Sequence, residues 1–378
     1  MYRGSYRAAV IGHTGCGNYG HGIDHAFTGL PRVEVVAVAD PDEAGRQRVA
    51  ERIGARRQYA DYHELLEAER PDVVAVATRW PDRHEAMITA AARAGAKAIY
   101  CEKPLATSLD EADRILAACD ARGVKLSVAH HNRVRPAPRL VRDLVGAGKI
   151  GRLRVIRTFG KQDRRSGGED LLVLGTHLMD LLRFFAGDAR WCHARVLANG
   201  RDAGPADVGR SQTENLGPIA GDDIIAGYGF DGGVTATFES TRAADGGGSA
   251  YYHLEVCGTA GILAFWSDPG SPVYFYPRPF VLPGSPDAWQ RLEPEPMPVP
   301  SGAPPDAGAF FASNQALVRD LLAAVEEDRP PINSGYDAGA ALELILAIYA
   351  SHLGGARVSL PLAELTHPLE RAAMAGPV

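Results

Sequence analysis

The chain has 378 residues, of which 46% are hydrophobic and 23% are charged, and its formal net charge is -6. This composition is that of an ordinary globular protein and excludes a disordered or fibrous class. Two domains are expected, because one hydrophobic core rarely serves so long a chain. The acidic balance and the lack of a dense basic run argue against nucleic acid as a partner.

Targeting and redox signals predict a cytoplasmic protein. The first apolar run, Ala8 to Ile11, is too short for a signal-peptide core, and no segment approaches the roughly 20 apolar residues of a membrane span. The five cysteines are far apart and form no CxxC pair, so we expect neither a disulfide framework nor a zinc site. No other cluster has metal-ligand spacing, and no metal is expected.

The first third of the chain alternates short apolar runs with helix-length amphipathic segments. Strands that are apolar throughout and are linked by helices predict a parallel sheet covered on both faces. We therefore expect an α/β domain, a doubly wound Rossmann sheet, over residues 1–129. The expected strands are Ala8 to Gly12, Val33 to Ala39, Val73 to Ala77, Ala98 to Cys101 and Leu126 to Ala129.

The pattern changes after residue 129 to runs rich in β-branched and alternating residues. Phe230 to Val234 carries the Asp-Gly signal of a tight turn between two strands. We expect an α+β domain with a large, mostly antiparallel open sheet over residues 130–360, and a C-terminal tail over 361–378. The expected strands are Leu153 to Phe159, Asp223 to Phe230, Val234 to Glu239, Tyr252 to Cys257 and Ile262 to Trp266.

The same region contains helical patterns and one proline-rich segment. The run from Pro277 to Pro305 cannot form central strands, so we expect it to cross the surface as a loop. The expected helices are Pro138 to Gly146, Leu171 to Phe185, Ala309 to Glu326 and Asp337 to Leu353.

The strongest local signal is a glycine-rich segment directly after the first expected strand. It contains GxGxxG at Gly15, Gly17 and Gly20, followed by a helical pattern. Glycines there let the backbone turn sharply and approach a pyrophosphate held at the helix N-terminus. His13-Thr14 separates the motif from Gly12, so the loop is longer than the usual fingerprint. The alternative interpretation is a glycine-rich turn without a ligand.

An acidic residue follows the second expected strand at the spacing of a dinucleotide-binding fingerprint. Asp40 lies 20 residues beyond Gly20. A carboxylate there accepts hydrogen bonds from an adenosine ribose and repels a 2′-phosphate. The sequence therefore favours NAD as the cofactor, with NADP less favoured.

Two further segments follow expected parallel strands, at the edge where such sheets bind ligands. They are Thr78 to His84 and Glu102-Lys103-Pro104. This order of motifs resembles the glucose-fructose oxidoreductase / inositol dehydrogenase / rhizopine-catabolism (Gfo/Idh/MocA) family. The resemblance continues along the chain in Gly148 to Gly151, Gly175 to Asp180, Glu255 to Gly261 and Leu360-Pro361.

The resemblance implies an enzyme that passes hydride between a secondary hydroxyl of a sugar, polyol or glycoside and a nicotinamide. In the family, the lysine of Glu-Lys-Pro lies beside both reactants, which makes Lys103 the central catalytic residue, and the next residue, Pro104, is often cis. The family's motif histidine exchanges the hydroxyl proton, which implies the same role for His177. Without the resemblance, Lys103 would be a surface charge and His177 a core residue. The implied cofactor-binding residues are Gly12, Gly15, Gly17, Asn18, Tyr19, Asp40, Thr78, Trp80, Glu102 and Lys103.

One position departs from the family pattern. The family often carries an aspartate four residues before the motif histidine, and this chain has Val173 there. Glu169 or Asp170 could supply the carboxylate from the helix N-terminus, where a negative charge is also favoured by the helix dipole. A capping role for these acids is the alternative.

The substrate pocket is expected around the segment that follows the fifth strand, together with acids of the later helical region. His130 to Arg133 aligns with a family stretch that lines the pocket, with Asn132 where an arginine is common. The implied substrate-binding residues are Asp180, Asn132, Arg133, His130 and Asp170.

Two other functions fit the same motifs. The enzyme could keep NAD tightly bound and catalyse a redox-neutral isomerisation, elimination or glycoside cleavage. A ligand-sensing regulator with the same fold is the other alternative, since function follows from the site and not from the fold. The resemblance also implies a homodimer or homotetramer formed through the open sheet.

Overall fold

The computed structural model describes residues 4–211, 214–242, 252–298 and 310–375. It divides into two compact units. Unit 1 comprises Met1–His131, Gln212–Gly217 and Met297–Gly339, and unit 2 comprises Asn132–Ser211, Pro218–Pro296 and Ala340–Val378. The first boundary lies two residues beyond the expected one. The two later segments of unit 1 fall within the range expected for the second domain.

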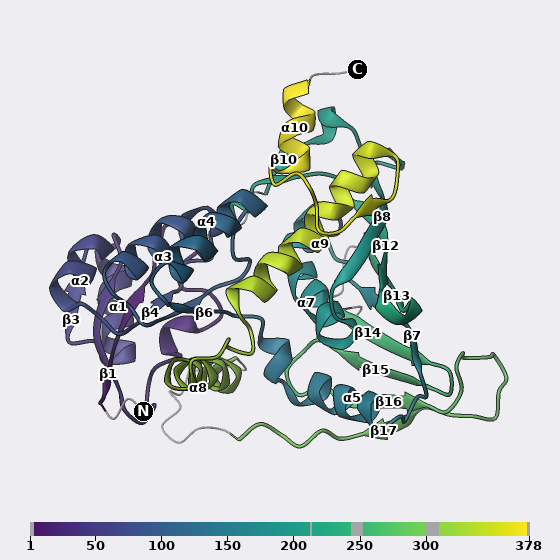
Figure 1. Cartoon of the computed structure of the whole chain (residues 1–378), viewed down its shortest axis with the longest axis horizontal. Helices are drawn as coiled ribbons and strands as arrows, with labels where there is room; N and C mark the ends of the chain where they lie inside the picture. Colours follow the sequence, from purple (N-terminus) through teal and green to yellow (C-terminus); the bar gives the residue numbers. More distant parts are fainter. Residues whose placement is uncertain (1–3, 212–213, 243–251, 299–309, 376–378) are drawn as a thin grey trace. The chain divides into compact units, whose positions relative to one another are not determined.

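Unit 1 is built on a six-stranded parallel sheet with the strand order β3-β2-β1-β4-β5-β6 (Figure 1). This is the order of a dinucleotide-binding Rossmann domain, and it confirms the expected fold class. The interior strands β4 and β5 are fully buried, which explains their continuous apolar sequences, and β1 is buried except at Arg7. β2 is buried in its second half. The strands are β1 (Tyr6–Ile11), β2 (Val33–Ala39), β3 (Arg57–Tyr59), β4 (Val73–Val76), β5 (Ala98–Cys101) and β6 (Lys125–Val128).

Helices contact each other in two groups in unit 1. Right-handed crossovers toward β3 and toward β6 place their helices on opposite faces of the sheet. Asp42 and Asp61 cap the helices after β2 and β3 through their side-chain oxygens. One group is α2 (Tyr62–Glu69), α3 (His84–Arg93) and α4 (Leu109–Asp120); the other is α1 (Glu43–Ile53), the 3-10 helix η1 (Ile23–His25) and α8 (Phe311–Glu327).

Helix α8 explains why the later segment belongs to unit 1. It contacts β5 and β6, although about 180 residues separate it from β6 in the chain. The helical pattern itself was predicted from the sequence as Ala309 to Glu326, but its assignment to the second domain differs from the structure. Packing between distant segments, which no local pattern encodes, decides this assignment.

The glycine loop is not followed by an α-helix, and the expectation of one is wrong. Only the three-residue η1 and a series of turns lie between residues 21 and 30. Gly22 has a left-handed φ of 74° at the position where a helix would begin. Gly29 also has a positive φ, and β-branched and aromatic residues between them have modest helix propensity. A pyrophosphate bound here would therefore meet loop amides and not the N-terminus of a regular helix.

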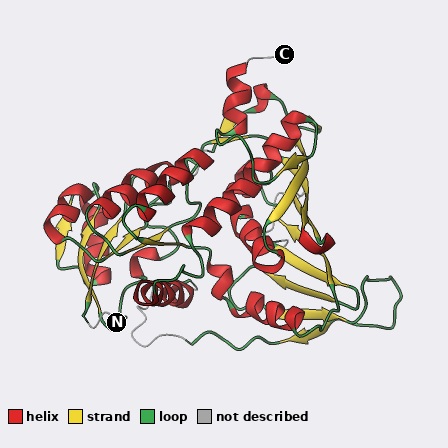
Figure 2. Ribbon diagram, in the orientation of Figure 1, coloured by secondary structure: helices red, strands yellow, loops and turns green. Residues whose placement is uncertain are grey.

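Unit 2 is built on one large sheet, whose strands are among those drawn in yellow in Figure 2. The strand order is β17-β16-β15-β14-β7-β13-β12-β8-β18, with β9 paired to β8. Only the pairing of β7 with β13 is parallel along this path, which confirms the expected mostly antiparallel sheet. The strands are β7 (Leu153–Phe159), β8 (Ala189–Ala198), β9 (Arg201–Asp202), β12 (Asp223–Phe230), β13 (Thr235–Thr241), β14 (His253–Gly258), β15 (Ile262–Trp266), β16 (Val273–Tyr276), β17 (Gln290–Leu292) and β18 (Val358–Ser359).

The long helices of unit 2 lie on one side of this sheet (Figures 1 and 2). The long ones are α5 (Pro136–Gly146), α7 (Gly175–Ala186) and the part of α9 (Gly335–Gly354) that belongs to this unit, and the short α6 (Gly168–Val173) precedes α7. The predicted helix from Leu171 to Phe185 is instead two helices, because α6 ends before Leu174. The carbonyl of Leu174 accepts a hydrogen bond from the Tyr252 hydroxyl at 3.3 Å, which supports the break.

The proline-rich segment is mostly irregular, and the C-terminal tail contains a helix. From residue 277 to 298 the chain is mostly irregular apart from β17, and Phe280, Val281 and Leu282 are exposed, as expected for a surface loop. The rest of the run, from residue 299 to Pro305, lies outside the described residues. The expected tail contains a helix, α10 (Pro368–Ala375). No helix in the described part of the chain has the length and apolar character needed to cross a bilayer.

Candidate active site

The glycine loop between β1 and η1 turns back on itself. The amides of Cys16 and Asn18 both donate to the carbonyl of His13, at 2.9 and 3.1 Å. Gly17 and Asn18 have left-handed φ values of 78° and 67°. Glycine adopts this conformation without a steric penalty, and asparagine tolerates it better than most residues. The loop is therefore a compact turn, and Gly15 lies exposed at its tip.

Three glycines of the loop are required by close packing. A Cβ atom on Gly12 would lie 2.0 Å from the ring of Tyr19, and one on Gly20 would lie 2.2 Å from Oε2 of Glu102. A Cβ on Gly17 would lie 2.6 Å from the Cβ of Arg79. These distances are far below van der Waals contact, so a side chain at these positions would displace either the loop or the side chain that it meets.

The segment after β4 holds the loop in place. The hydroxyl of Thr78 donates to the carbonyl of Cys16 at 2.8 Å, and the amide of Gly20 donates to the carbonyl of Ala77 at 2.7 Å. Trp80 packs against the position of Gly17. The predicted cofactor residues after β1 and β4 are thus in contact with each other.

Asp40, at the end of β2, is fully buried and binds the same loop. Its carboxylate accepts hydrogen bonds from the amide and hydroxyl of Thr14, at 3.0 and 2.7 Å, and from the amide of Asp42 at 2.9 Å. A carboxylate has about four acceptor positions, and these donors occupy most of them. A ribose hydroxyl that binds Asp40 must therefore compete with Thr14, a residue that the sequence interpretation did not include.

A pocket of about 400 Å³ opens beside Asp40, within the size range of small-molecule sites. It lies at the carboxyl ends of β1 and β2, where Rossmann domains bind the adenosine half of a dinucleotide. Together with the closely packed glycines, it makes this end of the sheet a candidate dinucleotide site. The lining residues are Gly12, His13, Ala39, Asp40, Pro41, Ala60, Asp61, Tyr62, Arg83, Ala86 and Met87.

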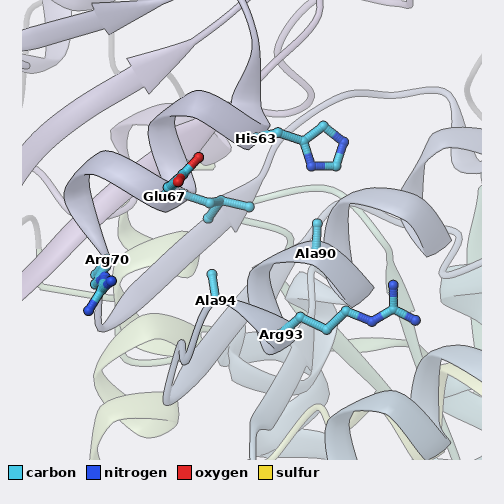
Figure 3. A pocket seen from close by; sticks show the side chains of 7 residues that line it. His63, Glu67, Arg70, Ala90, Arg93 and Ala94 are labelled. Atoms are coloured by element: carbon cyan, nitrogen blue, oxygen red, sulfur yellow. The ribbon is translucent and has the colours of Figure 1, made fainter.

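A larger pocket, of about 560 Å³, lies between α2 and α3 and contains none of the predicted site residues (Figure 3). Its polar side chains are those of His63, Glu67, Arg70 and Arg93. The size of a pocket therefore does not locate the candidate active site in this chain.

Lys103 follows β5 and is 1% exposed, next to the fully buried Glu102. Its Nζ lies 3.9 Å from Oε1 of Glu102, and the peptide bond to Pro104 is cis, as the resemblance implied. Burial by itself raises the pKa of Glu102, but its interactions with His21 and Lys103 outweigh burial and hold this pKa well below the usual range. Glu102 is therefore a permanent negative charge beside the lysine.

Asn314 of helix α8 forms hydrogen bonds with several segments at this end of the sheet. The side-chain oxygen of Asn314 binds Nε2 of His131 at 2.6 Å and accepts from the hydroxyl of Tyr100 at 2.7 Å. Its amide nitrogen donates to the carbonyls of His21 and Gly22. Asn314 thus links the segment after the glycine loop to the end of β6, and nothing in the sequence pattern singled it out.

In unit 2, Arg133 and Asp180 form a buried ion pair. The guanidinium Nε lies 3.0 Å from both carboxylate oxygens, and Nη2 lies 2.8 Å from Oδ1. Asp180 is fully buried on α7, and the ring of Phe184 lies 5.8 Å from the guanidinium carbon. Two residues predicted to bind substrate therefore bind each other.

The other predicted substrate residues fall in different places. Asn132 donates to the hydroxyl of Ser267 at 2.6 Å and accepts from Arg135 at 3.0 Å. His130 belongs to unit 1, where its carbonyl accepts from Asn333. His177 is half-buried in the first turn of α7, and Val173 is buried at the end of α6.

Asp170 is the buried carboxylate nearest in sequence to the missing family aspartate. Oδ2 accepts from Ser240 at 2.8 Å and from the amide of Lys161 at 3.0 Å. Within the described residues, Oδ1 is buried without a hydrogen bond. Burial raises the pKa of Asp170 to about 6, against the hydrogen bonds that lower it. Asp170 and Val173 share a face of α6, because they are three residues apart.

The raised pKa of Asp170 predicts a pH effect on stability. Below the unfolded pKa of about 3.9, Asp170 is protonated in both the native and the unfolded state, and its burial does not lower the free energy of unfolding. As the pH rises through about 6, burial opposes ionisation in the native state, and the free energy of unfolding falls. An Asp170→Asn variant cannot ionise, and its amide oxygen still accepts from Ser240. We expect the free energy of unfolding to shift in favour of the variant by about 3 kcal/mol between about pH 4 and about pH 7.5. Denaturant unfolding of both proteins at the two pH values measures this shift.

A partly buried acid provides a contrast for that experiment. Partial burial raises the pKa of Asp163, but hydrogen bonds from Arg165 hold it below the usual range. Asp163→Asn is therefore expected to lose stability relative to the wild type as the pH rises, which is the opposite direction. A pH-independent difference between wild type and Asp170→Asn would contradict the burial argument.

The five cysteines are buried and free, and among the described residues no group of three His, Cys, Asp or Glu side chains is placed to hold a metal ion. The predicted cofactor residues thus lie together at one edge of the unit 1 sheet. The predicted substrate residues belong to unit 2, apart from His130. The sequence did not indicate Thr14, His21 or Asn314 as site residues, because the residue that each contacts is distant in the chain.

Comparison with protein families identifies the class of protein that these features define. Residues 6–130 match the oxidoreductase family with an NAD-binding Rossmann fold, and residues 139–264 match the GFO/IDH/MocA C-terminal domain. The chain is an oxidoreductase with a Rossmann domain of the NAD-binding type. It belongs to the Gfo/Idh/MocA family, as the motifs predicted.

Curated relatives of the chain are named dehydrogenases and reductases. It is 28% identical to D-apiose dehydrogenase of Paraburkholderia graminis over 386 residues, which covers 99% of this chain and 94% of that protein. It is 30% identical to 1,5-anhydro-D-fructose reductase of Ensifer adhaerens over 245 residues, which covers 61% of this chain and 67% of that protein. Levoglucosan dehydrogenase of Pseudarthrobacter phenanthrenivorans is 28% identical over 260 residues, with coverage of 62% and 65%.

Solved structures share the fold. An NAD-binding oxidoreductase from Klebsiella pneumoniae superposes with a TM-score of 0.75 at 24% identity, covering 95% of this chain and 100% of that one. Levoglucosan dehydrogenase in complex with NADH and L-sorbose superposes with a TM-score of 0.74 at 20% identity, covering 95% and 99%. At these identities the likeness establishes the fold alone.

Proposed function

We propose that this chain is an NAD-dependent dehydrogenase that acts on a secondary hydroxyl of a sugar, polyol or glycoside. The observation that carries the proposal is the position of Lys103. Its ammonium lies beside the Glu102 carboxylate, and this carboxylate touches the last glycine of the loop expected to bind the cofactor. A cation held at the end of a Rossmann strand in this way is suited to act on a substrate bound beside a nicotinamide.

The proposed cofactor is NAD, which accepts or supplies the hydride when it is bound. The glycine loop, Thr78 and Trp80 would hold it, and the pocket beside Asp40 would take its adenosine half. The negative charge of Asp40 disfavours a 2′-phosphate, which supports NAD over NADP.

The proposed roles of this chain's own residues follow from their chemistry. Lys103 donates to the substrate oxygen and exchanges its proton as hydride moves. His177 is the second proton-transfer residue, through an imidazole that is half-buried on α7. The Arg133 and Asp180 pair orders the surroundings of α7, and Asp170 supplies the buried carboxylate that the family usually carries at position 173.

The substrate class rests on the relatives. A D-apiose dehydrogenase aligns with nearly all of this chain, and levoglucosan dehydrogenase and 1,5-anhydro-D-fructose reductase align with smaller parts. We therefore propose a monosaccharide or anhydrosugar substrate. We also propose a homodimer or homotetramer formed through the open sheet, where Ile225 and Trp266 are 57% and 38% exposed.

A panel assay tests this function. The purified chain is incubated with NAD or NADP and with aldoses, anhydrosugars, inositols, sugar acids and glycosides, and reduced cofactor is followed by absorbance. We expect reduction of NAD with at least one neutral sugar and a lower kcat/KM with NADP. Failure of every substrate to reduce either cofactor would contradict the proposal. Bound NAD that is never consumed while the sugar is converted would instead support a redox-neutral reaction.

A further inference from the structure

His21, directly after the last glycine of the loop, contacts Glu102 with two donors. Its ring Nδ1 lies 2.9 Å from Oε1 of Glu102, and its backbone amide donates to Oε2 at 3.3 Å. Glu102 is fully buried, and the His21 side chain is 21% exposed. The carboxylate is therefore held at both oxygens by a single residue that the proposed function does not use.

The other ring nitrogen of His21, Nε2, lies beside a second charged residue. Nε2 of His21 lies 3.4 Å from Nη2 of Arg79, whose Nη1 lies 4.0 Å from Oε1 of Glu214. An arginine only donates hydrogen bonds and an ionised carboxylate only accepts them. Nδ1 of neutral His21 must therefore carry the proton, and Nε2 must present its lone pair to Arg79. The neighbours of this ring select one tautomer.

Glu102 connects this arrangement to the candidate catalytic lysine. Its Oε1, which binds Nδ1 of His21, is also the oxygen 3.9 Å from Nζ of Lys103. We propose that His21 is a positioning residue for Lys103, which fixes Glu102 as the charged partner of the lysine while the imidazole is neutral. This inference rests on the proposed function only for the role of Lys103.

The arrangement predicts that protonation of His21 weakens the electrostatic interaction between Glu102 and Lys103. A protonated imidazole would place a second cation on the carboxylate oxygen that faces Lys103, and it would turn a donor toward the Arg79 guanidinium. The charged or titratable groups that face the ring are Glu102, Arg79 and His131, with Lys103 and Glu214 behind them. Phe310 covers another side of the ring with its centroid at 5.1 Å. The carboxylates of Glu102 and Glu214 balance the two cations Arg79 and Lys103, so protonation of His21 adds a positive charge that has no carboxylate of its own.

Two substitutions at position 21 separate the effect of the hydrogen bond that His21 donates from the effect of its protonation. His21→Leu removes the hydrogen bond to a buried charge, and we expect kcat to fall by about 10- to 100-fold while KM for sugar and NAD changes by less than about 3-fold. His21→Asn replaces Nδ1 with an amide donor that cannot be protonated. We expect it to recover most of the lost kcat and to lack one ionisation on the acid side of the kcat profile.

A matched control is His193→Asn, which changes an exposed histidine on β8 of the other unit. Its kcat and pH profile are expected to match the wild type. The proposal is wrong if His21→Leu keeps wild-type kcat, or if the pH profile of His21→Asn superposes on that of the wild type.

Nuclear magnetic resonance tests the same inference without substrate or cofactor. In protein with ¹⁵N-labelled histidine, neutral His21 is expected to show a protonated Nδ1 and an unprotonated Nε2. Lys103→Met should shift the Nδ1 proton resonance, because Glu102 loses a cationic partner. Lys97→Met, which removes the 2.7 Å contact to Asp72, should leave it unchanged. An Nε2-protonated ring, or no response to Lys103→Met, would overturn the proposal even if the panel assay succeeds. The expected spectra with no turnover would refute only the proposed function.

Discussion

Replacement of Lys103 by methionine is expected to lower kcat/KM for the sugar by about 10²- to 10⁴-fold, the usual contribution of a general acid or base. Methionine has a similar length and keeps the buried site filled, but it has no proton to exchange. The ion pair with Glu102 is lost as well. The affinity for NAD, measured by titration calorimetry, should change by less than about 10-fold, because the glycine loop and the pocket beside Asp40 are untouched.

Lys97→Met is the matched control for this prediction. Lys97 is a lysine of the same unit that pairs with Asp72 at 2.7 Å and is half-exposed, so its removal should leave kcat/KM within about 2-fold. If Lys103→Met turned over the sugar at the wild-type rate, the proposed role of Lys103 would fail. Equal losses in both variants would indicate a general effect on folding.

Replacement of Arg133 by methionine is expected to lower the free energy of unfolding by about 3 to 5 kcal/mol, because it removes the bidentate partner of a fully buried carboxylate. The double variant Arg133→Met/Asp180→Leu removes both charges and should regain most of that loss. Urea unfolding followed by fluorescence measures the wild type, the single variants Arg133→Met and Asp180→Leu, and the double variant at one pH. A coupling energy near zero in this double-variant cycle would contradict the buried-pair interpretation.

The more exposed pair of Arg157 and Glu255 serves as a comparison for the stability lost when the buried pair is broken. Its nitrogen and oxygen lie 3.0 Å apart, close to the distances in the buried pair, but the two side chains are 48% and 25% exposed. Arg157→Met should therefore cost less than about 1 kcal/mol. The contrast separates the effect of burial from the effect of contact distance.

Several elements could be predicted because local sequence and burial agree. β5, β7, β12 and β15 have the expected bounds, since a strand buried in a sheet is a continuous or alternating apolar run. β3 and β17 were missed because they are short edge strands with exposed polar residues. The break at Leu174 was missed because it depends on Tyr252, which comes from a strand far along the chain.

By itself, the sequence determined the doubly wound Rossmann class, the glycine loop and the motif around Lys103, because strand periodicity and strand-end motifs are local. Only the tertiary structure decided what each charge contacts. Asp40 binds Thr14 across 26 residues, Glu102 binds His21 across 81, and Asn314 binds His131 across 183. Such pairs form where the fold brings distant segments to one sheet edge, and burial then strengthens their interactions. No spacing in the chain reports them.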